Sequence, residues 1–297
     1  MRVRVRYSGI NPSDCNRRRG IRDRPGYPLI IPHSDGAGVI DMVGEGVSRA
    51  RIGEPVWVWN AQRGRAFGTA AQFVALPAAQ AVPLKGAALE AGACFGVPAM
   101  TAYLSLFADG SLENRDVLVT GGAGAVGLYA VQFARLAGAR TVISTVSSEA
   151  KARVVAEAGA PVIINYRTDA VAECIMRATE GRGVDRISEV DFGGNLKTTL
   201  AVMQQSCAIG AYASKGAPEP VLPFYPLLFS NIVVRFIQCS MMLAALRAAA
   251  MRDLQRWCEA DALRHLDCVV RPIEDIASAH ELVEGGAVIG KVLVELP

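Results

Sequence analysis

The sequence predicts an α/β fold in which a domain with a doubly wound parallel sheet is joined to a β-rich domain. Three observations support this prediction. After about residue 96, short apolar runs alternate with amphipathic helical segments, and spaced glycines follow the first of these runs. Before residue 96, short strand-like runs are separated by glycine-rich turns. The 297 residues are sufficient for two domains with separate cores.

The composition is that of a globular protein. Hydrophobic residues make up 51% of the chain, and the formal net charge of +3 is too small to favour a nucleic-acid partner. Arginines alternate with apolar residues at the start, where a signal peptide needs a continuous apolar run, and no run is long enough for a membrane span. The seven cysteines include no C-x-x-C pair, which is typical of reduced thiols. We expect a cytoplasmic protein that binds neither membrane nor nucleic acid.

The first part of the chain reads as strands and turns. Val3, Val5 and Tyr7 alternate with arginines, which predicts an edge strand with one wet face. Four prolines then indicate a loop-rich region, at positions 12, 25, 28 and 32. Further strands are expected at Gly36–Val43, Pro55–Trp59 and Ala71–Leu76.

The rest of the chain alternates strands and helices, as a parallel sheet requires. Strands are expected at Val117–Thr120, Thr141–Val146, Val162–Asn165, Arg186–Val190, Ser206–Tyr212 and Ile232–Ile237. Helices are expected at Leu128–Leu136, Ala150–Ala158, Val171–Thr179 and Leu196–Gln204. The tail adds a helix at Met242–Cys258, a strand at Val269–Arg271, a helix at Ile276–Gly285 and a strand at Lys291–Leu296.

The glycines after the first strand of this region have G-x-G-x-x-G spacing. Such glycines let the chain turn sharply, let backbone N–H groups approach a pyrophosphate, and let a helix pack closely on a strand. The helix that follows adds the positive end of its dipole. The alternative is a glycine-rich turn that binds nothing. The candidate dinucleotide-binding residues are Gly122, Gly124, Ala125, Val126 and Gly127.

The tip of the next strand favours NADPH over NADH. NAD-binding folds generally place an acidic residue there to accept hydrogen bonds from the ribose 2′-hydroxyl, whereas this tip reads Thr145–Ser148. Ser147, Ser148 and the nearby Lys151 offer donors and positive charge to a 2′-phosphate, although Glu149 is close in sequence. In the alternative interpretation these serines only cap the next helix.

Several short motifs in combination resemble a zinc-independent medium-chain dehydrogenase/reductase of the NADPH:quinone oxidoreductase, or zeta-crystallin-like, family. They are Asn11–Asp14, Pro32–Gly38, Gly53–Val56, Thr101–Tyr103, the glycine loop, Asn165–Arg167 and Ala279–Val294. The resemblance implies a GroES-like catalytic domain from residues 1–96 and 241–297 and a Rossmann NADPH-binding domain from residues 97–240. It also implies an active site in the cleft between them.

The resemblance further implies a reductase without metal. At the positions where zinc-dependent relatives have two cysteines and a histidine, this chain has Asn11, Val97 and Ser34, which are poor ligands for zinc. A quinone or another electron-poor enone suits such an enzyme, because two-electron reduction of a quinone gives an aromatic hydroquinone. The alternatives are a 2-enoyl-thioester reductase of the same superfamily and a non-catalytic NADPH-binding structural or sensor protein.

Individual roles follow from the matching positions. Asn11 resembles the family's polar residue beside the nicotinamide and substrate, and Thr101 matches a residue near the cofactor. Ser147, Lys151 and Tyr166 match positions around the adenosine 2′-phosphate. The alternatives are an ordinary Asn-Pro turn at Asn11 and plain aromatic packing of Tyr166.

The sequence also departs from the family's pattern. Arg22 stands where enoyl-thioester reductases have a catalytic tyrosine, and Tyr27 is a second candidate for that place. The family's first hairpin, before Arg2, is missing from the sequence, which would leave the partner edge of Val3–Tyr7 unpaired. The apolar, β-branched strand Ile232–Ile237 is expected at the outer edge of the parallel sheet, where the resemblance implies joining of two subunits into a homodimer.

Overall fold

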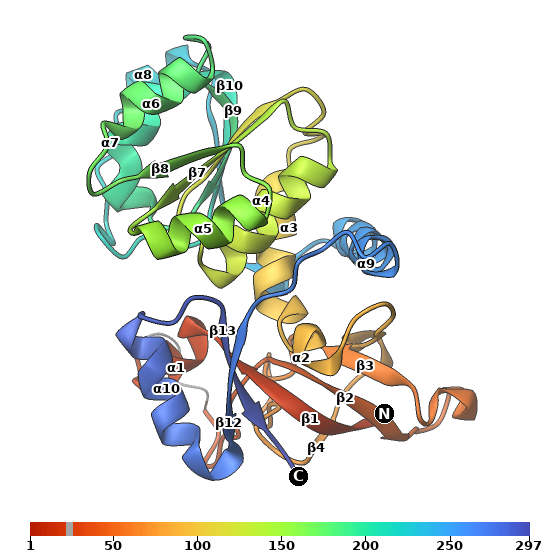
Figure 1. Cartoon of the computed structure of the whole chain (residues 1–297). Coiled ribbons are helices and arrows are strands. Elements are labelled where there is room, and N and C mark those ends of the chain that lie inside the picture. The colour runs from red at the N-terminus through yellow and green to blue at the C-terminus, as the bar shows by residue number, and fades with distance from the viewer. Residues whose placement is uncertain (22–25) are drawn as a thin grey trace. The chain divides into compact units, whose positions relative to one another are not determined.

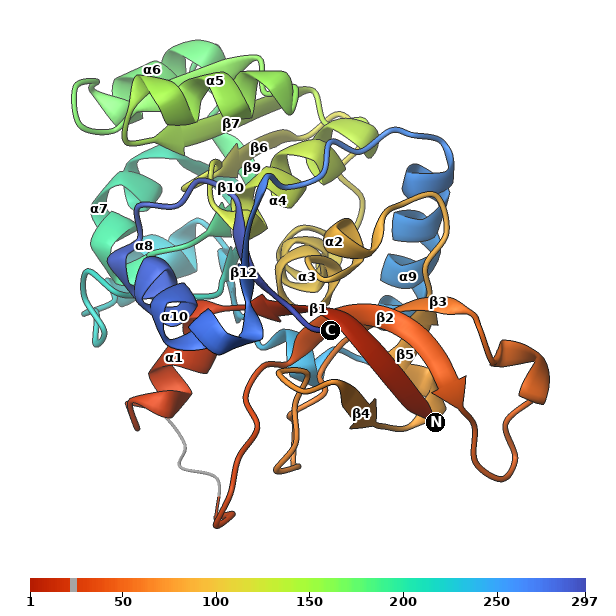
Figure 2. The same ribbon diagram turned by 60° about the horizontal axis from the view of Figure 1, so that its bottom comes forward.

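The computed structural model describes residues 1–21 and 26–297 and divides into two compact units. The terminal unit comprises Met1–Pro98 and Ala248–Pro297, and the central unit comprises Ala99–Arg247. Figures 1 and 2 show the elements of both units. Within the described residues, no helix combines the length and the apolar character that crossing a membrane requires.

Seven strands form one sheet in the terminal unit. The path through this sheet is β12-β13-β1-β2-β3-β5, and β4 also pairs with β1. The strands are β1 (Arg2–Ile10), β2 (Asp35–Met42), β3 (Pro55–Val58), β4 (Phe73–Ala75), β5 (Ala81–Pro83), β12 (Cys268–Pro272) and β13 (Lys291–Glu295). The pairs are antiparallel except for β12 with β13, which is parallel.

The first strand is central in this sheet, so the expectation of an edge strand with an unpaired partner edge is wrong. β2 pairs with β1 from Arg2 to Gly9. On the other side of β1, Arg2–Arg4 pairs with β4 and Tyr7–Ile10 pairs with β13. The sequence pattern could not show this, because β13 comes from the opposite end of the chain. The expected wet face is present, since Val3 and Val5 are buried and Arg4 and Arg6, which alternate with them, are exposed.

The proline-rich segment begins with a helix that was not predicted. Asn11 is the N-cap of α1 (Pro12–Arg18), and Pro12 occupies the first turn, where its missing N–H costs no hydrogen bond. Asn11 and Asp14 form a reciprocal capping box.

The other helices that belong wholly or mostly to the terminal unit are α2 (Leu89–Gly92), a π-helix (Phe95–Ala99), α9 (Ala244–Glu259) and α10 (Ile276–Gly285). Short 3₁₀ turns occur at Arg49–Arg51, Ala78–Gln80, Cys239–Met241 and Ile273–Asp275.

Six parallel strands form the sheet of the central unit, in the order β11-β10-β9-β6-β7-β8. They are β6 (Asp116–Val119), β7 (Thr141–Val146), β8 (Val162–Asn165), β9 (Val184–Glu189), β10 (Met203–Ala211) and β11 (Val233–Phe236). Read from β8, the chain order is that of a Rossmann fold, and the order reverses between β6 and β9. The predicted doubly wound parallel sheet is confirmed, with β11 at one edge.

Helices cover both faces of this sheet. α3, α4 and α5 lie on one side, and α6, α7 and α8 lie on the other (Figure 1). Their bounds are α3 (Met100–Phe107), α4 (Ala125–Leu136), α5 (Glu149–Glu157), α6 (Val171–Ala178), α7 (Phe192–Val202) and α8 (Phe224–Phe229). α3 and α8 were not predicted. α7 begins four residues earlier than expected. Its first turn contains Gly193 and Gly194, which disfavour a helix in isolation, so the sequence pattern does not indicate this start.

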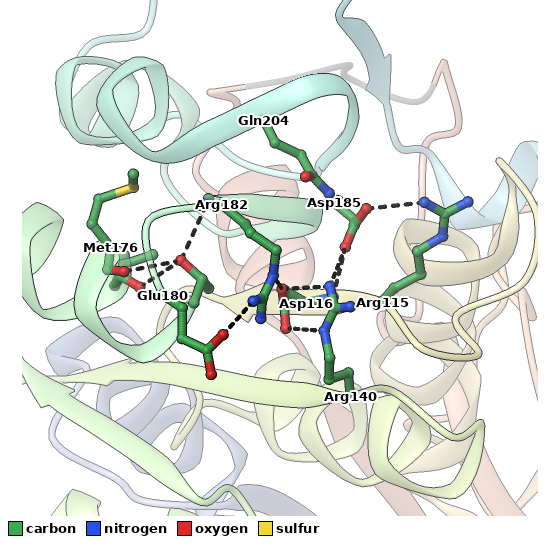
Figure 3. Close-up of polar contacts among 11 residues, drawn as sticks. Arg115, Asp116, Arg140, Met176, Glu180, Arg182, Asp185 and Gln204 are labelled. Carbon is green, nitrogen blue, oxygen red and sulfur yellow. Dashed lines mark hydrogen bonds and ion pairs between the residues drawn. The ribbon is translucent and has the colours of Figure 1, made fainter.

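Two aspartates at the amino ends of β6 and β9 hold a cluster of ion pairs (Figure 3). Asp116 is fully buried and accepts hydrogen bonds from Nε of Arg140 at 3.0 Å and Nη2 at 2.7 Å. Arg182 Nε lies 3.4 Å from the same carboxylate. Asp185 accepts from the Asp116 backbone N–H at 2.7 Å and from Arg115 at 3.0 Å. Although burial raises the pKa of Asp116, hydrogen bonds and the positive charges of Arg140 and Arg182 lower it overall.

Replacing Asp116 with Asn should lower the free energy of unfolding by about 2 kcal/mol near neutral pH, because the uncharged amide would face two guanidinium groups. The folded-state pKa of Asp116 lies below its unfolded value. The stabilisation is therefore present above the unfolded-state pKa and is lost as the pH falls through the folded-state pKa. Urea denaturation of both proteins across the acid range measures the difference, which should shrink toward zero at the acid end.

The matched control is Arg153→Ala, because the ion pair of Arg153 with Glu149 lies on the exposed surface of α5. Exposed pairs one helical turn apart contribute less than about 0.5 kcal/mol. Equal losses in the two variants, or a loss in Asp116→Asn that does not change with pH, would contradict the role assigned to Asp116.

Candidate functional site

The glycine loop brings β6, β7 and α4 closer together than side chains would allow. Gly121 has a φ of 65°, the left-handed region that favours glycine. A Cβ atom on Gly122 would overlap the side chain of Ser144 in β7, and one on Gly127 would overlap the backbone of Gly121. Gly122 and Gly127 therefore set the spacing between the helix and the sheet.

Gly124 is different, because a side chain there would need only a small shift of one backbone carbonyl. It is exposed, its φ is −77°, and a Cβ atom would meet only the Gly121 carbonyl at 3.3 Å. Gly124 is the N-cap of α4, and Ala125 and Val126, the first residues of the helix, are partly exposed. The first N–H groups of a helix have no acceptor within it, so this end presents backbone donors and the positive end of a dipole. An anion that approaches Gly124 would meet both.

The tip of β7 is hydrogen-bonded to the glycine loop. Thr145 accepts from the N–H of Gly121 through its hydroxyl at 3.1 Å and from the N–H of Gly122 through its carbonyl at 3.0 Å. The Tyr166 N–H donates to the carbonyl of Val146 at 3.0 Å, so the residue after β8 lies beside this tip. The side chain of Tyr166 is 52% exposed. The loop and the ends of two strands thus form one surface.

The predicted 2′-phosphate residues lie together on that surface. Lys151 Nζ donates to the Ser147 hydroxyl at 3.1 Å. Ser148 is the N-cap of α5 and accepts from the Lys151 N–H at 3.4 Å, so the capping interpretation of Ser148 is confirmed. The exposed Glu149 carboxylate accepts from Arg153 at 2.8 Å. A basic and hydroxyl-bearing surface therefore surrounds the tip of β7.

A buried carboxylate that sequence reasoning missed lies at the end of β9, where the strand order reverses. Glu189 has no exposed surface, and its Oε1 accepts from the Thr120 hydroxyl at 2.9 Å, the Asp191 N–H at 2.6 Å and the Asn195 amide at 2.8 Å. Its Oε2 has no hydrogen-bond partner within the described residues. Burial raises the pKa of Glu189. Ligands of such sheets bind outside the carboxyl ends of the strands at this reversal.

Thr101 is buried on α3, which packs closely on the same sheet. The exposed fraction of Thr101 is 5%. Ser105, one turn further along α3, is hydrogen-bonded to Ser188 of β9 at 2.8 Å, and Gly210 of β10 leaves no room for a Cβ atom against Ser105. The helix that carries Thr101 is thus fixed on β9 and β10.

In the terminal unit, Asn11 belongs to a buried network of charged groups. Its exposed fraction is 2%. Its Nδ2 donates to Asp35 at 2.8 Å, and its Oδ1 accepts from Lys291 Nζ. Lys291 Nζ lies 3.6 Å from Asp35, and the Val97 N–H donates to the other Asp35 oxygen at 2.9 Å. Asn11 therefore bridges a buried lysine and a buried aspartate.

The carboxylates near Asn11 have altered acidities. Burial raises the pKa of Asp14 to about 7, and the nearby charge of Asp35 adds to the shift. Asp14 also accepts from the Asn11 backbone N–H at 2.8 Å. Burial raises the pKa of Asp35, while the charge of Lys291 opposes the shift. Asn11 is thus both the cap of a helix and a link in an ion network, which goes beyond the ordinary turn residue of the alternative interpretation.

A second buried chain of hydrogen bonds lies beside this network. His33 has a φ of 79°, unusual for a residue with a side chain. Its Nδ1 lies 2.8 Å from the Ser8 hydroxyl, which lies 2.8 Å from the Thr69 hydroxyl, and Thr69 donates to the Asp35 carbonyl. Because a carbonyl only accepts, Thr69 accepts from Ser8, and Ser8 accepts from the Nδ1–H of His33.

The chain continues to a second histidine. His33 Nε2 lies 2.8 Å from His280 Nε2. Burial lowers the pKa of His33 to about 3, so this ring is neutral, and since its proton is on Nδ1, its Nε2 is an acceptor. His280 therefore donates, and its Nδ1 is left as an acceptor 3.6 Å from the Cys15 sulfur. These contacts hold His33 in its left-handed conformation. The sequence alone gave no indication that the two histidines are in contact.

The positions that match zinc ligands carry other chemistry. The Asn11 side chain is hydrogen-bonded to Asp35 and Lys291, and the Val97 backbone N–H donates to Asp35. Ser34 lies just before Asp35 in the chain. Among residues 1–21 and 26–297, no group of three or more His, Cys, Asp or Glu side chains is placed to hold a metal ion.

The two candidates for the missing tyrosine have different outcomes. Arg22 lies outside the described residues. Tyr27 is 41% exposed, and its hydroxyl donates to the carbonyl of Gly64 at 2.8 Å.

Two family models match the chain. Residues 1–86 match the alcohol dehydrogenase GroES-like domain, and residues 125–255 match the zinc-binding dehydrogenase domain. A quinone oxidoreductase from Lama guanicoe is 31% identical over 99% of this chain and 88% of its own length. Prostaglandin reductase-3 from Mus musculus is 31% identical over 99% of this chain and 81% of its own length.

A solved structure has the same fold. Quinone oxidoreductase from Escherichia coli, complexed with NADPH, is 23% identical and superposes with a TM-score of 0.86 over 99% of this chain and 90% of its own. The terminal unit is thus a GroES-like domain and the central unit a Rossmann domain. The chain belongs to the zinc-independent quinone oxidoreductase family of medium-chain dehydrogenases/reductases.

Proposed function

We propose that the protein is an NADPH-dependent reductase that transfers hydride to a quinone or another electron-poor enone without a metal ion. The observation that carries this proposal is Gly124, an exposed glycine at the amino end of α4 where a Cβ atom would meet only one backbone carbonyl of the chain, at 3.3 Å. The tip of β7, which is hydrogen-bonded to the glycine loop, ends in Ser147 and is followed by Lys151, and the Glu149 carboxylate between them is paired with Arg153.

The surface around Gly124 fits a phosphorylated dinucleotide. The pyrophosphate would accept hydrogen bonds from the first backbone N–H groups of α4, at Ala125 and Val126. Gly122 and Gly127 contribute by permitting the loop's shape. The 2′-phosphate would lie against Ser147, Lys151 and Tyr166, with Ser148 holding the start of α5. NADPH would thereby be favoured over NADH.

The protein's own residues would position the reactants and exclude water. NADPH, when bound, supplies the hydride, and the quinone takes up this hydride and a proton to become a hydroquinone. Asn11 would act as a positioning residue, since its amide is fixed between Lys291 and Asp35. Thr101 would lie near the cofactor on the rigid helix α3. The fixed polar groups replace the metal that zinc-dependent relatives use.

The alternatives differ in which acceptor is reduced. The name of the mouse relative supports testing enones beside quinones. A 2-enoyl-thioester reductase would prefer enoyl thioesters to both, and a non-catalytic structural or sensor protein would bind NADPH without turnover. The family resemblance of the chain is compatible with each of these, so the acceptor decides between them.

Steady-state oxidation of NADPH with quinones, enones and enoyl thioesters, beside calorimetric titration of NADPH, separates these functions. The proposal expects turnover with quinones or simple enones, no stoichiometric zinc by elemental analysis, and full activity after treatment with a chelator. Tight binding of NADPH with no turnover on any acceptor would favour the non-catalytic function. One tightly held zinc per chain, lost together with activity, would overturn the metal-free mechanism.

The protein is further proposed to form a homodimer through β11. This strand ends the sheet of the central unit, and its Phe236 is 71% exposed. Phe224 and Phe229 of the preceding helix α8 are also exposed. A second copy that continues the sheet would cover both the open edge and this apolar surface.

Sedimentation of the unmodified protein should show a dimer, and Val234→Pro should convert it to a monomer with unchanged circular dichroism. An unmodified protein that is monomeric at micromolar concentration would refute the proposed dimer.

Gly124→Ala should weaken NADPH binding by at least about tenfold, because the added methyl group occupies the approach to the helix end. The fold should tolerate it, since Ala as a helix cap costs about 1 kcal/mol relative to a good cap. The comparison variant is Gly127→Ala, whose Cβ overlaps the Gly121 backbone and should reduce thermal stability strongly. Calorimetric titration and thermal melts measure both quantities. Unchanged affinity in Gly124→Ala would place the phosphate elsewhere.

Lys151→Ala should remove most of the preference for NADPH over NADH. Loss of a charge-assisted phosphate contact costs about 1.5–3 kcal/mol, so the Kd for NADPH should rise by at least about tenfold while that for NADH stays constant. Arg153→Ala is the matched control, because the Arg153 guanidinium on the same helix is held by Glu149. Equal affinities of the unmodified protein for the two cofactors would disprove the assignment of Lys151.

A further inference from the structure

Two cysteines that are distant in the sequence are in contact inside the terminal unit. Cys94 follows α2, and Cys268 is the first residue of β12. Their sulfur atoms lie 3.7 Å apart although 174 residues separate them in the chain. Both are free thiols, as are the other five cysteines.

Each of the two thiols has a backbone carbonyl as a second hydrogen-bond acceptor beside the other sulfur. The Cys94 thiol lies 3.3 Å from the Glu90 carbonyl, and the Cys268 thiol lies 3.3 Å from the Leu266 carbonyl. Each thiol has a single proton, so the Cys94 proton points either to the Glu90 carbonyl or to the Cys268 sulfur, which only accepts once it is a thiolate. A disulfide between the two sulfurs therefore displaces at most this one S–H···S contact, because each thiol proton also has a carbonyl within reach.

The two thiols differ in access and acidity. Cys94 has no exposed surface, whereas Cys268 is partly exposed. A hydrogen bond from Cys94 to the Cys268 sulfur lowers the pKa of Cys268, and the positive charge of Lys291 acts in the same direction. The same contact raises the pKa of Cys94. Since the thiolate is the nucleophile, a soluble oxidant would react first at Cys268.

The other buried thiols lack such a partner. Burial raises the pKa of Cys15 to about 11 and those of Cys207 and Cys258 to about 12. Inert thiols of this kind are a suitable internal reference for a reactive pair.

We propose that Cys94 and Cys268 are a redox modification site, which a hydroperoxide converts to a disulfide. The Cys268 thiolate attacks the peroxide, the O–O bond breaks, and protonation gives a sulfenic acid and one molecule of water. The Cys94 sulfur then attacks the Cys268 sulfur, the S–O bond breaks, and a second water leaves with the proton of Cys94. In total, two thiols and one hydrogen peroxide give one disulfide and two waters.

This disulfide would join two segments that hold Asn11. Cys268 lies directly opposite Lys291 in the β12–β13 pairing, and Lys291 donates to Asn11. Cys94 leads into the π-helix whose Val97 N–H donates to Asp35, the other partner of Asn11. Oxidation therefore adds a covalent link around the buried network, independently of the proposed reductase activity.

The test treats the reduced full-length protein with hydrogen peroxide, alkylates the remaining thiols, and identifies peptides by mass spectrometry. We expect one cross-linked peptide pair containing Cys94 and Cys268, which dithiothreitol removes. The other five cysteines should be recovered alkylated. Cross-links between other cysteines, or alkylation of Cys94 and Cys268 to the same extent as in the untreated protein, would overturn the proposal.

Three variants separate the two steps. With Cys94→Ser, Cys268 should still be oxidised but should accumulate as a sulfenic acid that dimedone labels and that excess peroxide converts to sulfinic acid. With Cys268→Ser, Cys94 should stay reduced because it is buried. Cys207→Ser in the central unit is the matched control and should form the cross-link as the unmodified protein does. Dimedone labelling of Cys268 that is equal with and without Cys94 would contradict the second step.

Discussion

The close approach of β6, the glycine loop and α4 is the constraint on which the proposed nucleotide site depends. Gly122 against Ser144 and Gly127 against the Gly121 backbone leave no volume for a methyl group, so the start of α4 is held directly at the carboxyl end of the sheet. Backbone N–H groups of the loop donate to the hydroxyl and the carbonyl of Thr145 and fix the tip of β7 relative to that helix end. The donors proposed for the pyrophosphate and for the 2′-phosphate therefore share one rigid frame.

The terminal unit buries a lysine, Lys291, in its interior. Desolvation of the Lys291 ammonium is costly unless partners are placed around it. Asp35 supplies the opposite charge, and Asn11 supplies an acceptor for the ammonium and a donor for the carboxylate. Burial raises the pKa of the neighbouring Asp14 to about 7, and the charge of Asp35 adds to this shift while that of Lys291 opposes it. The position of Asn11 is thus set by groups from both ends of the chain.

Local patterns in the sequence predicted much of the central unit. β7 and β8 have the expected bounds, because their apolar runs are continuous and bounded by turns. The glycine spacing located the loop, and the serines located the cap of α5. The same reasoning missed α1, where Pro12 starts a helix instead of breaking one, and the first turn of α7, where tertiary packing outweighs two glycines.

Contacts between distant residues could not be predicted from one sequence. Asn11 was selected by resemblance, but nothing near it in the chain indicates Lys291, which is 280 residues away. The pairing of His33 with His280 and of Cys94 with Cys268 is equally remote. β1 was placed at an edge for the same reason, since its partner β13 lies at the other end of the chain. Glu189 gave a weak signal, a carboxylate at the end of a buried strand, that becomes informative only when the strand order is known.

The proposed NADPH site lies at the amino end of α4 and the tips of β7 and β8. Hydrogen–deuterium exchange of the protein with and without saturating NADPH tests it most directly. We expect slower exchange on binding in Gly124–Leu128, in Ser147–Lys151 and around Tyr166, with little change in β4 or β5. Binding of NADPH by calorimetry with exchange in these segments unchanged would contradict it.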